Sequence, residues 1–369
     1  MGFNIANLPG DGIGPEVLRE GVKVLQAAEN LVGGFELVFQ DYAVGANAYL
    51  KTKKALSESV YQECKKANAI YMGAIGIPGV VDSHGTEVTG HVMFKIRFDL
   101  DLFAGVRPIK LYPGIKSGLT GKKNIDFVIL RENCEGLFAS YGGGTFTTND
   151  VATDTMVITR KGSERLFDYA FELALKRNGR LLDQKRMVTC SAKWNVFRSF
   201  AFFKDIFNEI AKKYEGRVSP DYAIIDALTL WMVQTPENFD VIVTENMFGD
   251  IISDMAAGFI GGMGMAPSGD IGFNHAMFQP SHGTAPTIAG KNIANPIAAI
   301  LSGKMMLDWL AERNNNTSMK FAANLIEKAV EYTLENGIKT TDIGGTASTI
   351  QFGDSVVKSL EYLAKQTKG

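Results

Sequence analysis

Short apolar runs alternate with stretches of helical period along much of the chain. The runs have the length and composition of buried strands, and they lie at 35–40, 68–76, 126–131, 187–192, 221–227 and 239–246. Strands that alternate with helices in this way are typical of a sheet whose faces are covered by helices. The pattern therefore predicts an α/β protein.

The clearest helical period lies between residues 193 and 212. Its apolar residues recur at steps of four and three, and they are Val196, Phe200, Phe203, Phe207 and Ile210. This stripe predicts an amphipathic helix that packs one face on the sheet or on a partner subunit.

Two glycine-rich segments interrupt the alternation. Residues 139–160, ASYGGGTFTTNDVATDTMVITR, combine a glycine triplet with threonines and valines, which favour strands, and they predict a protruding β-ribbon. Residues 255–272, MAAGFIGGMGMAPSGDIG, predict the end of a helix followed by a loop.

Length and composition limit the classes of function. A chain of 369 residues suits two domains, or one large domain with an insertion. No apolar run approaches the roughly 18 residues that span a bilayer, so we expect a cytoplasmic protein without a membrane segment. With 38 basic and 40 acidic side chains, the chain has no overall positive field to attract nucleic acid. Its three cysteines form no CxxC pair, which argues against a disulfide framework or a zinc site.

The segment LPGDGIGPEV at residues 8–17 differs from a dinucleotide-binding fingerprint. Its glycines, Gly10, Gly12 and Gly14, are spaced G-x-G-x-G, one residue too short for the G-x-G-x-x-G of a Rossmann fold. Pro15 suits the first turn of a helix, and Glu16 complements the positive end of that helix. The segment therefore predicts a tight turn that leads into a helix.

Three arginines are the first candidates for binding a ligand. Arg97 and Arg107 bracket FDLDLFAGV, and Arg131 ends an apolar run in front of ENCEG. Each guanidinium can bind a carboxylate through two hydrogen bonds, so two or three of them together would select a dicarboxylic acid. As isolated charges they would instead be surface residues.

Carboxylates and one lysine suggest a metal site. Asp250 and Asp254 are spaced i, i+4 and would project from one face of a helix, as a partial site for Mg²⁺ or Mn²⁺ or as an exposed acidic face. Asp226 follows an apolar run and is a third candidate ligand. Lys193 follows another such run, and it could act as a base near a metal or simply be solvated.

Taken together, these stretches resemble the isocitrate/3-isopropylmalate dehydrogenase family of metal-dependent β-decarboxylating dehydrogenases. The motifs LPGDGIGPEV, LFAGVRP, RENCEG, SAKWN, FGDIISD and HGTAPTIAGKNIANP occur in the family's order and cover nearly the full length. The resemblance implies an isocitrate/isopropylmalate dehydrogenase-like two-domain sheet architecture with a β-ribbon clasp, not a Rossmann fold. Residues 1–99 and 257–369 would form the large cofactor-binding domain. Residues 100–256 would form the small central domain with the dimer interface, including the clasp at 139–160.

The resemblance also implies a homodimer whose two active sites each use residues from both subunits. Arg97, Arg107 and Arg131 would bind the malate part of a 2-hydroxy dicarboxylate substrate. Asp250 and Asp254, with Asp226 of the partner subunit, would bind Mg²⁺ or Mn²⁺. Lys193 of the partner subunit would be the catalytic base, and K⁺ is a further candidate ion.

Residues from both ends of the chain would bind the cofactor. NADP-using relatives carry a Lys-Tyr pair where this chain has Thr287 and Ile288, and a 2′-phosphate needs positive charge, so NAD is favoured over NADP. The residues assigned to the cofactor by this resemblance are Ile13, Gly76, Asn195, Gln279, His282, Gly283, Thr284, Ala285, Thr287, Ile288 and Asn295.

Departures from the family pattern bear on catalysis and substrate. Phe138 stands where most relatives have the tyrosine that protonates the enolate, so Tyr141 or Lys193 would substitute, or activity would be low. Gln279 replaces a common glutamate. Met93 and Phe94 give a γ-carboxylate no partner, which favours 3-isopropylmalate, D-malate or tartrate over isocitrate. The alternative is a degenerate family member that acts as a regulatory or binding subunit with little catalysis of its own.

Overall fold

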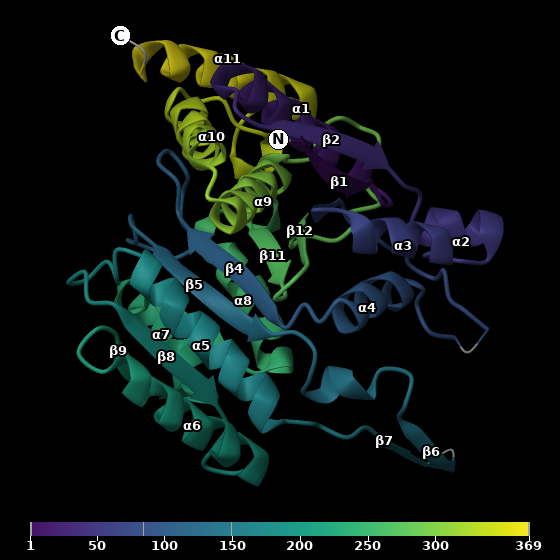
Figure 1. Ribbon diagram of the computed structural model, residues 1–369, viewed down its shortest axis with the longest axis vertical. Helices are drawn as coiled ribbons and strands as arrows, with labels where there is room; N and C mark the ends of the chain where they lie inside the picture. Colours follow the sequence, from purple (N-terminus) through teal and green to yellow (C-terminus); the bar gives the residue numbers. More distant parts are fainter. Residues whose placement is uncertain (1, 84, 149, 368–369) are drawn as a thin grey trace.

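The computed structural model describes residues 2–83, 85–148 and 150–367 (Figure 1). In this part of the chain, ten strands form one sheet in the order β2-β1-β3-β12-β11-β4-β5-β10-β8-β9. Their bounds are β1 Gly2–Leu8, β2 Glu36–Asp41, β3 Ala69–Met72, β4 Ala104–Lys110, β5 Asp126–Glu132, β8 Met187–Ala192, β9 Ser219–Ile224, β10 Val241–Thr244, β11 Pro267–Ile271 and β12 Ala276–Pro280. The α/β prediction is confirmed, and each predicted apolar run overlaps a strand.

The order of the strands brings the two ends of the chain together. The strand β1 pairs in parallel with β2 and β3, and β12 continues this parallel half beside β3. The strand β11 then pairs antiparallel with both β12 and β4, and β4 pairs antiparallel with β5. The strands β5, β10, β8 and β9 form a second parallel half. The predicted division into two domains falls between β11 and β4, where the sheet itself is continuous.

Helices cover both faces of the first half of the sheet. One face carries a helical layer made of α1 Gly14–Val32, α9 Ile297–Asn314, α10 Thr317–Glu335 and α11 Thr349–Thr367 (Figure 1). The other face carries α2 Ala46–Thr52, α3 Glu58–Lys66 and α4 Thr89–Asp99. Successive residues of β3 point to opposite faces, because Tyr71 joins the first apolar layer whereas Ile70 and Met72 join the second.

The second half of the sheet lies between α5 Arg160–Lys176 with α6 Arg198–Ala211 and α7 Ile225–Gln234 with α8 Asn246–Ala257 (Figure 1). The predicted stripe on α6 packs against α5, with the ring of Phe203 4.5 Å from that of Phe167. Val196 does not belong to the stripe. The helix begins only at Arg198, after a turn and the extended residue Phe197, and 60% of Val196 is exposed.

The glycine-rich segment 255–272 contains a strand that the sequence did not predict. The helix α8 ends at Ala257, two short 3-10 turns follow, and β11 then lies fully buried between β12 and β4. Proline, glycine and aspartate are poor strand formers, but strands on both sides provide partners that override this preference. At Gly269 a Cβ would lie 3.0 Å from the ring of Phe278, so the absent side chain permits close packing.

The predicted ribbon forms as a short antiparallel pair, β6 Thr145–Thr148 with β7 Val151–Thr153. It projects from the body of the molecule (Figure 1). Position 149 of the predicted clasp, like residues 1 and 369 at the predicted domain ends, lies outside the described residues.

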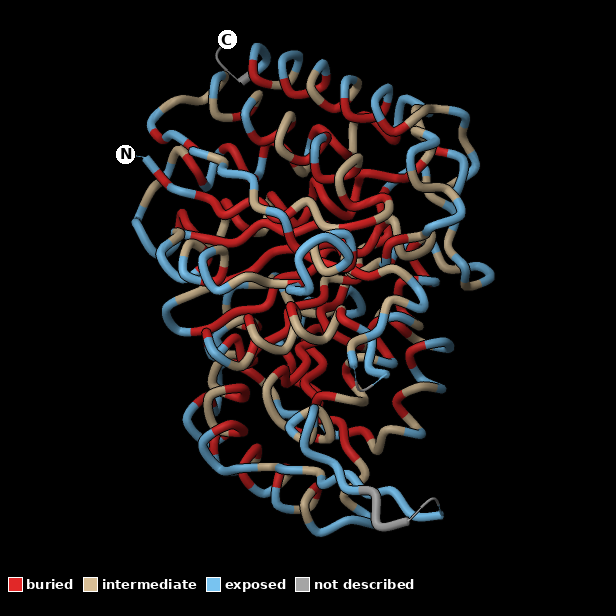
Figure 2. The backbone as a smooth tube through the Cα atoms, turned by 90° about the vertical axis from the view of Figure 1, so that its right-hand side faces the viewer, coloured by how far each residue is buried: buried red, intermediate tan, exposed pale blue. Residues whose placement is uncertain are grey.

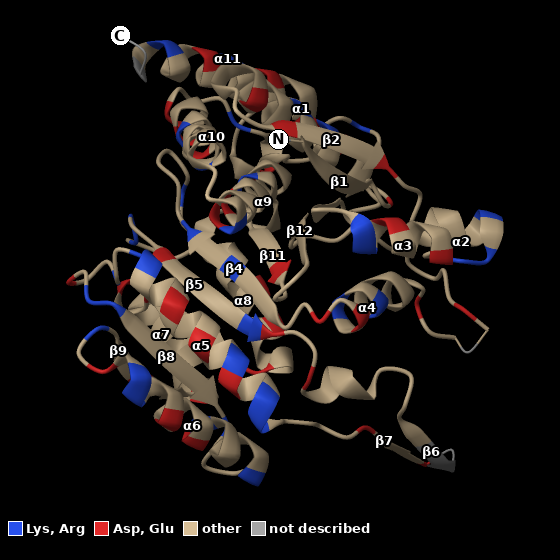
Figure 3. Ribbon diagram, in the orientation of Figure 1, with Lys and Arg blue, Asp and Glu red and all other residues tan. Residues whose placement is uncertain are grey.

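Burial is concentrated in the sheet and in the helix faces that contact it (Figure 2). One continuous apolar cluster joins both halves, from Phe3 and Leu25 to Phe127 and Phe207. Lysines, arginines, aspartates and glutamates are interspersed on the outer helices (Figure 3). None of the described helices is both long and apolar enough to cross a membrane.

Candidate active site

Three arginines from different elements are buried at one region of the sheet. Arg97 lies in the last turn of α4, Arg107 lies in β4, and Arg131 lies near the end of β5. Their exposed fractions are 6%, 6% and 2%. We call them the substrate arginines, after the role that the resemblance implies for them. The alternative that they are isolated surface charges is therefore wrong, and their burial supports the interpretation that they converge.

Electrostatics indicate that the substrate arginines lie close together. Burial, followed by the positive charges of Arg97 and Arg107, lowers the pKa of Arg131 to about 9. Burial and the charge of Arg97 also lower the pKa of Arg107, whose Nε is buried without a partner among the described residues. A cluster of buried, mutually repelling guanidinium groups is stabilised when an anion binds. A dicarboxylate meets this requirement.

The helix α8 places two carboxylates beside the substrate arginines. Asp250 forms an ion pair with Nη1 of Arg131, whose Nε donates to Oδ1 of Asn246 at 2.9 Å. Burial and the neighbouring Asp250 raise the pKa of Asp254, and the charges of Arg107 and Arg131 oppose that rise. Two carboxylates one helical turn apart provide the oxygen ligands that Mg²⁺ and Mn²⁺ prefer.

The remaining predicted ligand and the predicted base lie together in another place. Lys193 follows β8 and forms an ion pair with Asp226 at the start of α7. Within the described residues, no three His, Cys, Asp or Glu side chains form a metal-binding group, so one chain supplies two carboxylates but not a third. Asn195 lies in the exposed turn after Lys193.

The opening turn contacts the distant loop that the resemblance assigns to the cofactor. The backbone N–H of Ile13 donates to the carbonyl of Thr284 at 2.9 Å, and a Cβ at Gly12 would lie 2.2 Å from that oxygen. Ile13 is itself buried, in a cluster that includes Ile288. Pro15 lies in the first turn of α1, as predicted. The opening turn and the distant loop therefore pack against each other, and Ile13 helps to hold them together.

Some predicted cofactor residues have partners inside the protein. The side chain of Asn295 donates to Asp342 at 3.0 Å and accepts from the N–H of Ile297, so it caps α9. Among the described residues, Nε2 of His282 is buried with no partner, which leaves it free for a ligand. The other loop residues are partly or largely exposed except Thr284, and they are Gly283, Ala285, Thr287 and Ile288.

Sequence reasoning missed Asp11, in the middle of the opening turn. Its buried carboxylate accepts from the N–H groups of Ala46, Asn47 and Gly76 at 2.7–2.9 Å. It therefore caps α2 and holds the loop at Gly76, where a φ of +114° suits glycine. The only local signal was an acid between two glycines, which does not reveal such distant partners.

Aromatic rings line one side of the substrate arginines. The ring of Phe138 lies 5.0 Å from the guanidinium carbon of Arg131 and 5.7 Å from the ring of Phe94. Phe94 also contacts Tyr141, at 4.3 Å between ring centres, and the Tyr141 hydroxyl lies over Gly90 rather than toward the arginines. Met93 packs on the other side, in the apolar layer beneath α3 and α4. Phe94 and Phe138 thus form an apolar wall.

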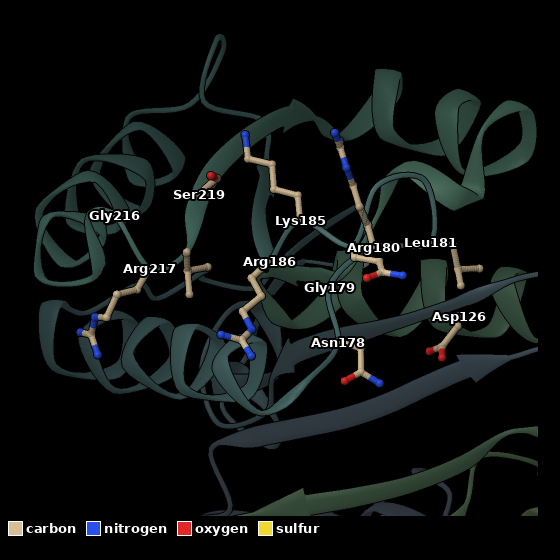
Figure 4. Close-up of a pocket in the computed structure, with 12 residues that line it drawn as sticks. Asp126, Asn178, Gly179, Arg180, Leu181, Lys185, Arg186, Gly216, Arg217 and Ser219 are labelled. Atoms are coloured by element: carbon tan, nitrogen blue, oxygen red, sulfur yellow. The ribbon is translucent and has the colours of Figure 1, made fainter.

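A pocket of about 750 Å³ lies far from these residues (Figure 4). It is lined by loops at the amino-terminal ends of β5, β8 and β9, whereas Arg131 lies near the carboxyl end of β5. No predicted site residue lines it. Its basic side chains are those of Arg180, Lys185, Arg186 and Arg217. The first two point upward in the view and the last two point downward, so the four do not form a single anion site (Figure 4).

Glu132, next to Arg131, gives a prediction about stability. Burial raises its pKa to about 7, against the opposing N–H groups of Cys134 and Glu135. The folded-state pKa lies above the unfolded value. The neutral carboxyl of Glu132 therefore makes its full contribution to the free energy of unfolding at low pH, and this contribution is lost as pH rises through about 7. Glu132→Gln should therefore increase the free energy of unfolding by about 2 kcal/mol more at pH 8 than at pH 5. Urea unfolding of both proteins at both pH values measures this, and an equal effect at the two pH values would contradict it.

Comparisons with known proteins identify the family. The family model described as "Isocitrate/isopropylmalate dehydrogenase" matches residues 4–356. The chain is 40% identical to the 3-isopropylmalate/3-methylmalate dehydrogenase of Methanocaldococcus jannaschii, with 96% of this chain and 98% of that one covered. It is 38% identical to the decarboxylating D-malate dehydrogenase of Escherichia coli, with 96% and 98% covered. The solved isocitrate dehydrogenase of Methylococcus capsulatus superposes with a TM-score of 0.84 at 34% identity, with 97% and 99% covered. The chain therefore belongs to the isocitrate/isopropylmalate dehydrogenase family.

Proposed function

We propose that this protein catalyses the NAD-dependent and divalent-metal-dependent oxidative decarboxylation of a (2R)-malate-type 2-hydroxy dicarboxylate. The observation that carries the proposal is the buried cluster of substrate arginines beside the carboxylates of Asp250 and Asp254. When bound, Mg²⁺ or Mn²⁺ would polarise the substrate hydroxyl and stabilise the enolate, and the nicotinamide would accept hydride.

The residues of this chain divide the remaining tasks. The substrate arginines would bind and orient the two carboxylates of the malate unit, because their burial makes each charge-assisted hydrogen bond strong. Asp250 and Asp254 would hold the metal. Lys193 of the partner subunit would take the hydroxyl proton, and Asp226 of the partner subunit would complete the metal ligands.

The substrate would carry an apolar γ-group or none. Phe94 and Phe138 offer no hydrogen bond to a γ-carboxylate, and a charge against these rings would lose its water without compensation. We therefore favour 3-isopropylmalate, D-malate or tartrate over isocitrate. NAD is favoured over NADP because Thr287 and Ile288 provide no positive charge for a 2′-phosphate.

A homodimer with shared sites is part of the proposal. Large apolar side chains are exposed near Lys193 and Asp226 and on α8, with exposed fractions of 43–60% for Phe197, Leu230, Trp231 and Ile251. Such residues are typical of surfaces that a second subunit covers. The same surface holds the predicted base, which would explain how it reaches the arginines of the other subunit.

The test is NADH formation with Mn²⁺ and K⁺ over D-malate, tartrate, 3-isopropylmalate, isocitrate and homoisocitrate. We expect oxidation of one of the first three acids, with slower or no reaction of isocitrate. No oxidation of any acid, combined with tight binding to a sister subunit, would overturn the proposal in favour of a regulatory subunit. The departures at Phe138 and Gln279 motivate that alternative.

Phe138→Tyr should raise turnover by at least about tenfold, because a phenol at this position could protonate the enolate. The ring already lies over Arg131, so the added hydroxyl extends from the wall of the substrate site. Steady-state rates of the two proteins measure the effect. Tyr362→Phe is the control, since this half-exposed tyrosine lies on the outer helix α11 and removal of its hydroxyl should change turnover less than twofold. Unchanged turnover in Phe138→Tyr would show that the missing phenol at position 138 does not limit turnover.

A further inference from the structure

A fully buried carboxylate lies behind the substrate arginines. Asp270 is in the middle of β11, the strand that the sequence did not predict, and none of its surface is exposed. Its Oδ2 accepts from Nε of Arg97 at 3.0 Å and from Nε2 of Gln279 at 3.2 Å. Its Oδ1 accepts from Nδ2 of Asn133 at 2.8 Å. Three elements of the site therefore meet at this one side chain.

The surroundings keep Asp270 ionised. Burial by itself would raise its pKa, but the charges of Arg97 and Arg107, together with the Asn133 hydrogen bond, lower the pKa below its usual value. A buried charge that loses its partners is costly, so Asp270 and Arg97 constrain each other. The carboxylate is thus a fixed negative charge at the base of a positive site.

The hydrogen bond to Asp270 uses only one edge of Arg97. The bond comes from Nε, and the structure records no partner for the two terminal nitrogens among the described residues. Since a guanidinium can bind a carboxylate with its terminal pair of N–H groups, the Nε anchor leaves that pair free. The anchor also restricts rotation of a long side chain that would otherwise lose entropy on binding.

We propose that Asp270 is a positioning residue that holds Arg97 in the orientation needed to bind a substrate carboxylate. The inference rests on the proposed function, because it takes Arg97 to be a substrate ligand. It also accounts for Gln279: an amide donates to Asp270, whereas a glutamate there would bring a second carboxylate within hydrogen-bond reach of the first.

The variant Asp270→Asn tests the proposal, with Asp240→Asn as its matched control. Asp240 is equally buried and accepts from Nε of Arg177 at 2.7 Å, but it lies in the opposite region, where its other oxygen accepts from the N–H of Met187 at the start of β8. Both variants remove a buried charge paired with an arginine. Only Asp270→Asn should affect the substrate site.

For Asp270→Asn we expect KM for the hydroxy acid to rise about tenfold or more, with KM for NAD changed less than twofold. For Asp240→Asn we expect a lower Tm with both KM values unchanged. An unaltered KM for the hydroxy acid in a folded Asp270→Asn protein would overturn the proposal, and so would equal changes of KM in the two variants.

A second variant keeps the test decisive if Asp270→Asn does not fold. Asn133→Ala removes one hydrogen bond from Asp270 but leaves its charge, and it should raise KM for the hydroxy acid about threefold, again with KM for NAD unchanged. No change of KM would overturn the proposal. If the wild-type protein oxidises none of the acids, the proposed function fails and this inference fails with it. If the wild type is active and the variants retain its KM, only this inference fails.

Discussion

We expect Lys193→Met to lower turnover by at least about a hundredfold, because Lys193 is the proposed acceptor of the hydroxyl proton and such a group contributes roughly 10²- to 10⁴-fold. Methionine preserves the length of the side chain and removes only its amine. Since Lys193 is a partly exposed residue paired with Asp226 and is not one of the buried arginines, KM for the hydroxy acid should change only a few-fold. Steady-state NADH formation over a range of substrate concentrations measures both quantities.

Lys185→Met is the matched control for this prediction. Lys185 lines the distant pocket at the amino-terminal ends of the strands, so the same chemical change there should leave turnover within twofold. A turnover of Lys193→Met within tenfold of the wild type would contradict the assigned base.

The second large effect that we expect is that of Asp254→Asn, which should weaken metal binding but increase the stability of the metal-free protein. Losing one of two metal carboxylates should raise the Mn²⁺ concentration needed for half-maximal activity by at least about tenfold. Without metal the variant should be more stable than the wild type at pH 8. Burial and Asp250 raise the pKa of Asp254, so its ionised form destabilises the fold once pH exceeds that pKa.

Activity titrations with Mn²⁺ and melting curves with a chelator test both parts. The stability advantage should shrink as pH falls, because the wild-type carboxyl takes up its proton at a higher pH in the folded state than in the unfolded state. Ser253→Ala provides a control on the same helix, since the Ser253 hydroxyl only donates a hydrogen bond to the backbone carbonyl of Asp250. A Mn²⁺ requirement equal to that of the wild type would remove Asp254 from the metal site.

The two variants also test the shared site when they are mixed. In a heterodimer of Lys193→Met with Asp254→Asn, both defects would fall in one site and the other site would be intact. Random reassociation of equal amounts should therefore restore about a quarter of wild-type activity. If each site used residues of one subunit only, mixing would restore nothing.

Local patterns in the sequence predicted several parts of this protein correctly. The apolar run ending at Arg131 is a buried strand, the spacing of Asp250 and Asp254 gives one face of a helix, and Pro15 starts α1 after the tight turn. These features depend on residues a few positions apart. Side-chain periods of two and 3.6 residues are therefore enough to reveal them.

Distant contacts decided the rest. The segment that contains Asp270 has the composition of a loop, yet it is a buried strand because β12 and β4 lie on either side of it. Arg97 and Arg131 were ambiguous as single charges, and only the order of the strands made them a buried cluster. The sequence by itself determined which short segments form strands and helices and which residue types are present for chemistry. The tertiary structure alone decided which of those residues meet, because hydrogen bonds and ion pairs between distant segments leave no period in the chain.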